Sequence, residues 1–204
     1  HLLLWITRGQ GRVLLNGARR GYGTHNALFI PAGQLMAVDL GRQTLGMALT
    51  LPPHDDLFLP PTAQHLRIVD NRDQNELAQI LDALNREQAA QNLLWQDAMK
   101  AHADLAAIWL RRHVQAQDGS GTKTTAAQRL VRAYCDRVVT RLGAGETMAD
   151  HAGALGVTPT HLTRVCKAET GRTAAALLTD RQVHAARHLL TQTTLAIQQI
   201  ARDL

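Results

Sequence analysis

The sequence predicts an α+β fold in two domains: a small antiparallel β-barrel with two amphipathic helices, followed by an all-helical domain. Three observations carry this prediction. Short β-rich runs alternate with glycine turns over residues 1–51. The hydrophobic period then changes from two to 3.6 from about residue 75 onward. Finally, the whole formal charge of +5 lies in residues 119–204 of the 204-residue chain, which is long enough for two hydrophobic cores.

The predicted barrel comprises residues 1–66. Asn16-Gly17 is a typical hairpin dipeptide because both residues tolerate positive φ, and Pro31-Ala32-Gly33 predicts another turn. Several short strands at this spacing are typical of a small barrel or sandwich. Proline pairs at 52–53 and 60–61 bracket an irregular connection. The runs that we interpret as strands are HLLLWIT, RVLL, NALFI, LMAVDL and LGMALTL.

Residues 67–118 predict two amphipathic helices. The first apolar stripe consists of Leu77, Ile80, Leu81 and Leu84. The second stripe is longer and consists of Leu94, Trp95, Ala98, Met99, His102, Leu105, Ala106, Trp109 and Leu110. Either the helices pack on the barrel, or one of them also forms a dimer seam. In the second case the candidate dimerisation residues are Trp95, Met99, His102, Leu105 and Trp109.

A polar, glycine-rich segment at residues 119–124 predicts a linker. After it, residues 119–204 contain 11 Lys/Arg and 6 Asp/Glu, whereas residues 1–118 contain 11 of each. Such confined positive charge is typical of a separate module that faces a polyanion. This module, residues 125–204, begins with a predicted helix over 125–142 that Gly143-Ala144-Gly145 ends.

A helix-turn-helix follows at about 147–169. Thr147 and Asp150 have the spacing of a capping box, with the acid near the positive end of the helix. Gly156 supplies the left-handed residue where the first helix ends. Thr158 can cap the second helix, and Pro159 fits its first turn because its missing N–H would have had no partner. The residues expected between the helices are Ala152, Leu155, Val157, Leu162 and Val165.

The outward face of the second helix carries side chains suited to nucleic acid. An arginine can donate two hydrogen bonds to guanine, hydroxyls can meet base edges or phosphates, and lysine can neutralise phosphate. The alternative interpretation is an ordinary solvated face of a helical corner. The candidate DNA-binding residues are Thr158, Thr160, His161, Thr163, Arg164 and Lys167.

The helix-turn-helix pattern partly repeats. Met148, Ala152 and Leu155 recur 49 residues later as Ile197, Ala201 and Leu204, and we interpret residues 194–204 as the start of a second unit. Residues 173–192 predict a rigid spacer helix between the two. Two such units could enter successive major-groove segments, about 34 Å apart along one face of B-DNA.

These residues resemble the AraC/XylS family of bacterial transcription regulators over about eighty residues. The motifs that carry the resemblance are Leu162, Arg164, Lys167 and Gly171, then Arg181, Ala185, Leu189 and Leu190. The resemblance implies a double-stranded DNA operator as partner and RNA polymerase as a further one. It places base contacts on Thr160, Thr163 and Arg164, and phosphate or surface positions on His161 and Lys167. Cys166 departs from the family, which often has an aromatic residue there.

The front segment, HLLLWITRGQGRVLLNG followed by GTHNALFIPAGQLM, resembles the cupin-type sensor domain of the same family through glycine and proline positions over about fifty residues. Metal-binding cupins gather several histidines, but His1, His25, His54 and His65 are isolated here, and Met36 stands where a ligand histidine would be. We therefore expect no metal, no cofactor and no catalytic residues. A small-molecule pocket in the barrel is the better hypothesis, with Trp5, Arg8, His25 and Met36 as effector-binding candidates. His184 and His188 are interpreted as a solvated face.

The function that this reading favours is a cytoplasmic, homodimeric, DNA-binding transcription regulator whose barrel senses a small molecule. Cys135 and Cys166 predict neither a disulfide framework nor a zinc site, and the sequence predicts neither a membrane span nor a signal peptide. Two alternatives stay open at this point. One is a cupin-like metal enzyme with a helical appendage, and the other is a ligand-independent DNA-binding protein whose barrel serves only assembly. The identity of the effector, the operator sequence and the choice between activator and repressor are open too.

Overall fold

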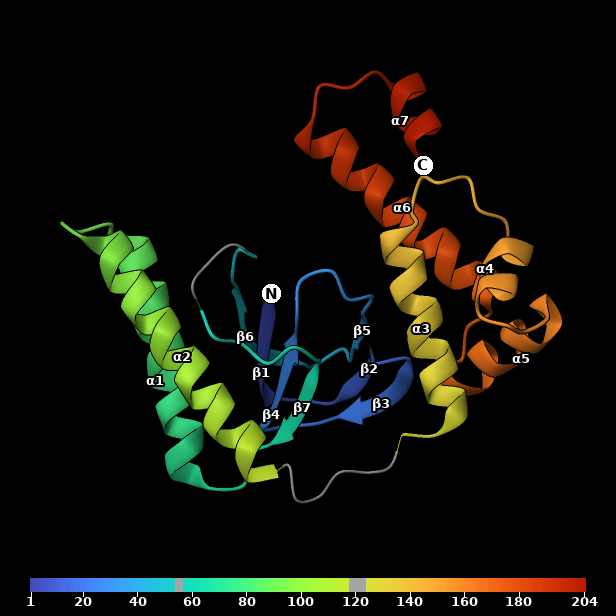
Figure 1. Ribbon diagram of the computed structural model, residues 1–204. Helices are drawn as coiled ribbons and strands as arrows, with labels where there is room; N and C mark the ends of the chain where they lie inside the picture. The colour runs from blue at the N-terminus through green and yellow to red at the C-terminus, as the bar shows by residue number, and fades with distance from the viewer. Residues whose placement is uncertain (54–56, 118–123) are drawn as a thin grey trace. The chain divides into compact units, whose positions relative to one another are not determined.

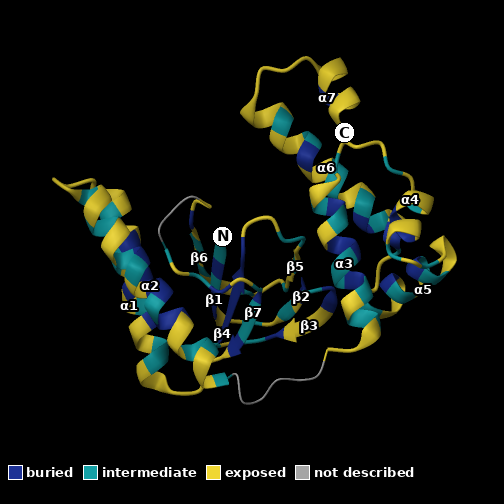
Figure 2. Cartoon of the chain, viewed as in Figure 1, coloured by how far each residue is buried: buried dark blue, intermediate teal, exposed yellow. Residues whose placement is uncertain are grey.

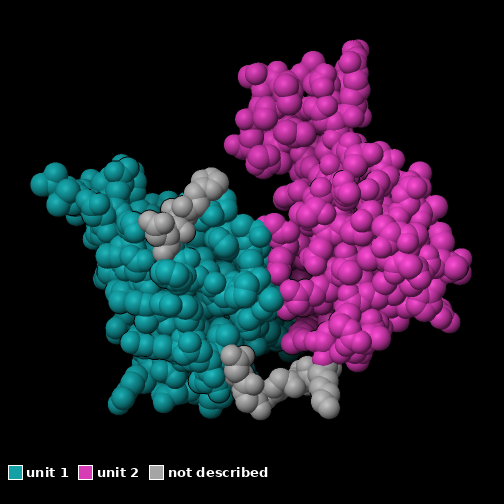
Figure 3. All heavy atoms as spheres, viewed as in Figure 1, with its two compact units in different colours: residues 1–13, 21–32, 38–122 teal, residues 14–20, 33–37, 123–204 magenta. Residues whose placement is uncertain are grey.

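The computed structural model describes residues 1–53, 57–117 and 124–204 (Figure 1). His54 and all but the last residue of the predicted linker at 119–124 lie outside the described residues. The chain divides into two compact units, coloured separately in Figure 3. Unit 1 consists of residues 1–13, 21–32 and 38–122, and unit 2 consists of residues 14–20, 33–37 and 123–204. Seven strands precede seven helices in the described residues, so the predicted α+β class is confirmed.

The strands form two sheets. The four-stranded sheet has the order β6-β1-β4-β7, and the three-stranded sheet has the order β3-β2-β5. In the larger sheet β1 runs antiparallel to both β4 and β6, with Trp5 opposite Ala27 on one side and Met47 on the other. The strands are β1 (Leu2–Arg8), β2 (Gly11–Leu15), β3 (Ala18–Tyr22), β4 (Asn26–Ile30), β5 (Ala37–Leu40), β6 (Leu45–Thr50) and β7 (Gln64–Arg67).

The Asn16-Gly17 turn joins β2 and β3 as predicted, since φ is 51° at Asn16 and 72° at Gly17. Two strands were not among the predicted runs. β3 contains the consecutive exposed arginines Arg19 and Arg20, and β7 is four residues long with no run of apolar side chains. Neither therefore shows the alternation by which strands are usually identified.

Two antiparallel helices, α1 (Asn71–Ala90) and α2 (Trp95–Gln117), cover one face of the four-stranded sheet. Asp70 caps α1 by accepting a hydrogen bond from the Arg72 N–H at 2.7 Å. Figure 2 shows that the buried residues of both helices lie on their inner sides. The first option of the sequence analysis, packing on the sheet, is what the structure shows. The shared core contains Leu3, Trp5, Ala27, Phe29, Leu66, Ile68, Leu77, Ile80, Leu81, Leu84, Ala106, Trp109 and Leu110.

The predicted stripe of α1 is confirmed, because all four of its residues are buried. The predicted stripe of α2 was wrong at two positions, since Leu94 is 66% exposed and Leu105 is 48% exposed. The buried face of α2 instead includes Ala103 and Ala107 beside Trp109. Alanines let the helix approach its neighbours closely. A stripe predicted from the large apolar side chains alone does not include them.

The described residues of unit 2 form five helices: α3 (Ala126–Thr140), α4 (Met148–Ala154), α5 (Pro159–Thr170), α6 (Ala174–Gln192) and α7 (Ile197–Asp203). The core among α3, α4, α5 and α6 includes Val131, Tyr134, Cys135, Val138, Ala152, Leu162, Cys166, Ala174 and Leu177. The Tyr134 hydroxyl donates a buried hydrogen bond to the Ala174 carbonyl at 2.7 Å, which ties α3 to the first residue of α6.

Candidate nucleic-acid interface

Short polar interactions fix where α4 and α5 begin. The Thr147 hydroxyl accepts from the Asp150 N–H, and the Asp150 carboxylate accepts from the Thr147 N–H, so the predicted capping box is confirmed. The Thr147 hydroxyl also donates to the Asp150 carboxylate at 2.6 Å, and this bond together with the one from the Thr147 N–H lowers the pKa of Asp150. At α5, Thr158 accepts from the His161 N–H at 3.2 Å and Pro159 occupies the first turn, as predicted.

The turn between α4 and α5 depends on Gly156. Its φ is +68°, in the left-handed region, and an added Cβ would meet nothing within 4 Å. The neighbouring Val157 N–H donates back to the Ala152 carbonyl at 3.0 Å, closing the end of α4. Gly171, with φ of 76°, ends α5 in the same way by donating to the Lys167 carbonyl. The helix α5 therefore has a defined start and a defined end.

The inner face of α5 is buried on α3 and α4. Leu162 and Cys166 are fully buried, and so is Ala152, which lets α4 approach closely. Burial raises the pKa of the Cys166 thiol to about 11 and that of Cys135 to about 12, so both thiols stay protonated at neutral pH. The smaller side chain expected beneath the helix at Cys166 is thus confirmed as a core position.

A charged cluster connects α3 with the start of α4, and it was not predicted. Glu146 accepts from Arg137 at 2.5 Å and lies 3.5 Å from the Arg141 Nε. His151, only 2% exposed, has its Nδ1 3.4 Å from the Glu146 carboxylate without a hydrogen bond, and its ring meets Tyr134 edge-on. Burial lowers the pKa of His151. No sequence pattern distinguishes this histidine from the exposed ones, because its burial results from the packing of α4 on α3.

The outer face of α5 is accessible. Thr158, Thr160, Arg164 and Lys167 are exposed, and His161 and Thr163 are half-buried, so none of the six candidate residues is buried. An Arg164 Nη2–H donates to His161 Nδ1 at 3.2 Å. A guanidinium has only N–H donors, so Nδ1 is the acceptor in this contact. Within the described part of the chain neither Arg164 nor Lys167 takes part in an ion pair, so both cations are available to an external anion.

The spacer helix and the partial repeat both have structural counterparts. Thr173 caps α6 by accepting from the Ala176 N–H, within one residue of the predicted start. In α7, Ile200 is buried, whereas Ile197 is 75% exposed. Ala201 is exposed although its counterpart Ala152 is fully buried. The repeat in sequence therefore gives a helix at the expected place, with a different residue facing the protein.

The four effector-binding candidates differ in their exposure, and their role stays a prediction. Trp5 is 2% exposed and belongs to the core against α1 and α2, where it stacks on His25 at 6.0 Å. Arg8 and Met36 are exposed.

The dimerisation candidates also differ in their exposure. Trp109 is buried, Trp95, Met99 and His102 are half-buried, and Leu105 is exposed.

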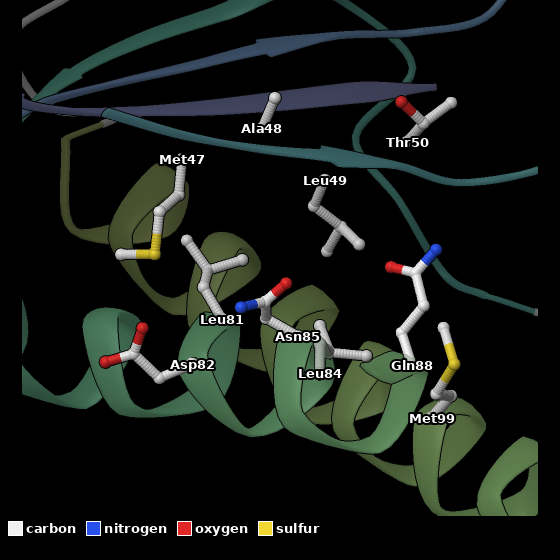
Figure 4. A pocket seen from close by; sticks show the side chains of 10 residues that line it. All are labelled: Met47, Ala48, Leu49, Thr50, Leu81, Asp82, Leu84, Asn85, Gln88 and Met99. Atoms are coloured by element: carbon white, nitrogen blue, oxygen red, sulfur yellow. The ribbon is translucent and has the colours of Figure 1, made fainter. Parts of the chain in front are cut away.

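Unit 1 does contain a groove that the sequence analysis missed. It has a volume of about 630 Å³ and lies between β6 and the helices α1 and α2 (Figure 4). A smaller pocket of about 250 Å³ shares four of its residues: Leu49, Thr50, Leu84 and Met99. No sequence signal could have located it, because it forms where a sheet edge meets a helix pair.

Two absences hold for the residues that the structure describes. No three His, Cys, Asp or Glu side chains there are grouped so that they could hold a metal ion. None of the helices described is long and apolar enough to cross a bilayer.

Comparisons with known proteins were made for sequence and for structure. A family model described as a helix-turn-helix domain matches residues 151–204. No curated protein sequence matches the chain significantly. Among solved structures, apo ToxT from Vibrio cholerae strain SCE256 is similar over 98% of this chain and 78% of its own, with 13% identity and a TM-score of 0.46. ToxT from Vibrio cholerae O395 with a bound naphthalenyl-butenoic acid is similar over 98% of this chain and 79% of its own, with 12% identity and a TM-score of 0.41.

Proposed function

We propose that this chain is a sequence-specific DNA-binding transcription regulator of the AraC type in which α5 enters the major groove, because residues 151–204 match a helix-turn-helix family model. One observation carries the proposal most directly. A rigidly capped helix presents Arg164 and Lys167 on one accessible face, and neither cation has an intramolecular ion pair in the described residues. The confined charge of residues 119–204 supports it, since phosphate attraction supplies much of the affinity for DNA.

The face of α5 divides into base-reading and phosphate-binding positions. Thr160, Thr163 and Arg164 are assigned to bases, with Arg164 donating to guanine O6 and N7. Lys167, one turn further from the start of the helix, is assigned to a phosphate. Thr158 and His161 lie at the positive end of α5, where a phosphate oxygen is also favoured.

The N-terminal unit is assigned the role of a cupin-like sensor for a small molecule, and the regulator acts as a homodimer that also meets RNA polymerase. Coupling follows from linkage: a molecule that binds one state of the protein more tightly shifts the population of the DNA-competent state. The shift cannot exceed the difference in its affinities for the two states. No covalent chemistry is required.

The first test separates readout of sequence from attraction to phosphate. The wild-type chain is used to enrich binding sites from a randomised DNA duplex pool, and affinities for the selected duplex and its single-base variants are measured for wild type, Arg164→Ala and Lys167→Ala. Arg164→Ala should cost about 1–3 kcal/mol and relax the preference at one base pair. Lys167→Ala should weaken binding to all duplexes alike and lower the salt dependence by about one counterion.

Two outcomes would contradict the proposal. Failure of the wild-type chain to enrich any sequence would remove sequence-specific recognition. Uniform weakening by Arg164→Ala, with an unchanged base preference, would make that side chain a phosphate contact. Arg112→Ala serves as a matched control, because this exposed arginine lies on α2.

A further inference from the structure

The β6 edge of the four-stranded sheet lacks the residues that usually protect a sheet edge. β6 is an outermost strand in the order β6-β1-β4-β7, and within the described residues it pairs only with β1. Native proteins usually protect such an edge with charged residues or proline, because its unpaired N–H and C=O groups invite another strand. β6 reads LGMALT and contains neither. Each of the other sheet edges in the described residues carries a charge: Arg67 in β7, Arg19 and Arg20 in β3, and Asp39 in β5.

The groove runs beside this edge. Figure 4 shows Met47 and Leu49 of β6 pointing toward the helices, while Ala48 and Thr50 point away from them. Met47 and Leu49 are only half-buried, and Leu45 at the start of the strand is 59% exposed. An added strand would lie about 4.8 Å from β6, with alternate side chains directed into the groove. The apolar groove and the uncharged edge thus suit the same occupant, an extended polypeptide segment.

A carboxylate lies at one end of the groove, and an ammonium group lines the pocket that adjoins its other end. Asp82 lies at the end with Met47, and Gln88 and Met99 lie at the end with Thr50 (Figure 4). Lys100 lines the adjoining pocket beside Thr50 and Leu51. Asp82 and Lys100 are both exposed, and neither forms an ion pair within the described part of the chain. An antiparallel neighbour that is a copy of the same surface reverses the two ends, so Asp82 would face Lys100 of the partner subunit.

We propose that β6 is the seam of a homodimer, in which two copies of the chain pair antiparallel through this strand about a two-fold axis. The two four-stranded sheets become one sheet of eight strands, and each copy places its Met47 and Leu49 beside the groove of the other. This seam deepens the proposed function by supplying its dimer, but it rests on separate observations. It also differs from a seam on α2, where Trp109 is already buried within its own chain.

Ala48 allows a direct test, because it is exposed and points away from the helices. Ala48→Lys would place two ammonium groups close to the two-fold axis, so sedimentation velocity should show dimers for wild type and monomers for the variant at the same concentration. Leu105→Lys, at an exposed position of α2, is the matched control and should remain dimeric. Monomeric wild-type protein at micromolar concentration would overturn the proposal. So would a monomeric Leu105→Lys beside a dimeric Ala48→Lys, which would move the seam to α2.

Charge exchange tests the two-fold arrangement. Asp82→Lys and Lys100→Asp should each raise the dimer dissociation constant about fivefold or more, and the double variant should restore it. Additive losses in the double variant would contradict the pairing.

Disulfide trapping tests the strand contact itself. Cys135 and Cys166 are buried, so Ala48→Cys supplies an accessible thiol that should give a covalent dimer on oxidation. Leu105→Cys should not. The reverse result would overturn the seam.

Separate variants test the dimer and the proposed DNA contact, so one proposal can be contradicted without the other. Arg164→Ala should leave the sedimentation of the chain unchanged, since α5 belongs to unit 2 and β6 to unit 1. Ala48→Lys should keep a salt-dependent affinity for DNA through one α5, while losing the gain that two linked α5 helices provide.

Discussion

At the residue scale, His151 should make stability depend on pH. Burial lowers its pKa below the usual 6.5, so at mildly acidic pH the unfolded chain takes up a proton that the folded chain does not. The stability that the uncharged His151 contributes should therefore be complete above about pH 6.5. It should be lost as the pH falls from there through the lowered pKa. Urea titrations from pH 7.5 to 5 should show a smaller decline for His151→Gln than for wild type. His184→Gln, at an exposed position of α6, should retain the wild-type decline; equal slopes in all three would remove His151 as the cause.

At the scale of one element, two glycines in the helix-turn-helix should respond oppositely to alanine. Gly156 has a φ of +68°, which costs alanine about 1–2 kcal/mol, although there is space for its methyl group. Gly153 is exposed within α4 and is equally open, so alanine should stabilise the helix there by up to about 1 kcal/mol. Thermal unfolding followed by circular dichroism should show shifts of opposite sign. Gly156→Asn should lose less than Gly156→Ala, and shifts of the same sign would contradict the turn geometry.

At the scale of the whole molecule, sensing and DNA binding should be reciprocal. A metabolite panel is first screened by thermal shift, since a compound that binds only the folded chain raises its melting temperature. If a hit changes the affinity for the selected duplex by some factor, the duplex must change the affinity for that compound by the same factor. Isothermal titrations with and without the duplex measure both. No thermal shift with any compound would instead favour a barrel that serves only assembly.

Local chemistry made much of unit 2 predictable from the sequence. Three features depend on residues at most three positions apart: the Thr147 capping box, the turn at Gly156 and the cap at Thr158. Their spacing can therefore be recognised in the sequence. The hairpin at Asn16-Gly17 was predictable for the same reason.

Features that depend on tertiary packing could not be predicted in this way. The stripe of α2 was misjudged because Ala103 and Ala107 face the core while Leu105 faces outward. The burial of His151 and the groove beside β6 require elements that are distant in sequence. The assignment of Thr160, Thr163 and Arg164 to DNA bases stays a prediction, since exposure permits contact without specifying it.

The hydrogen bond from Arg164 to His161 also bears on the entropic cost of binding DNA. A free arginine side chain loses up to about 2 kcal/mol of rotamer entropy when it is fixed against a ligand. On α5 that loss is partly met before any DNA arrives, because the His161 ring already restrains the guanidinium one turn away. A base contact by Arg164 would therefore spend less of its binding energy on ordering this side chain.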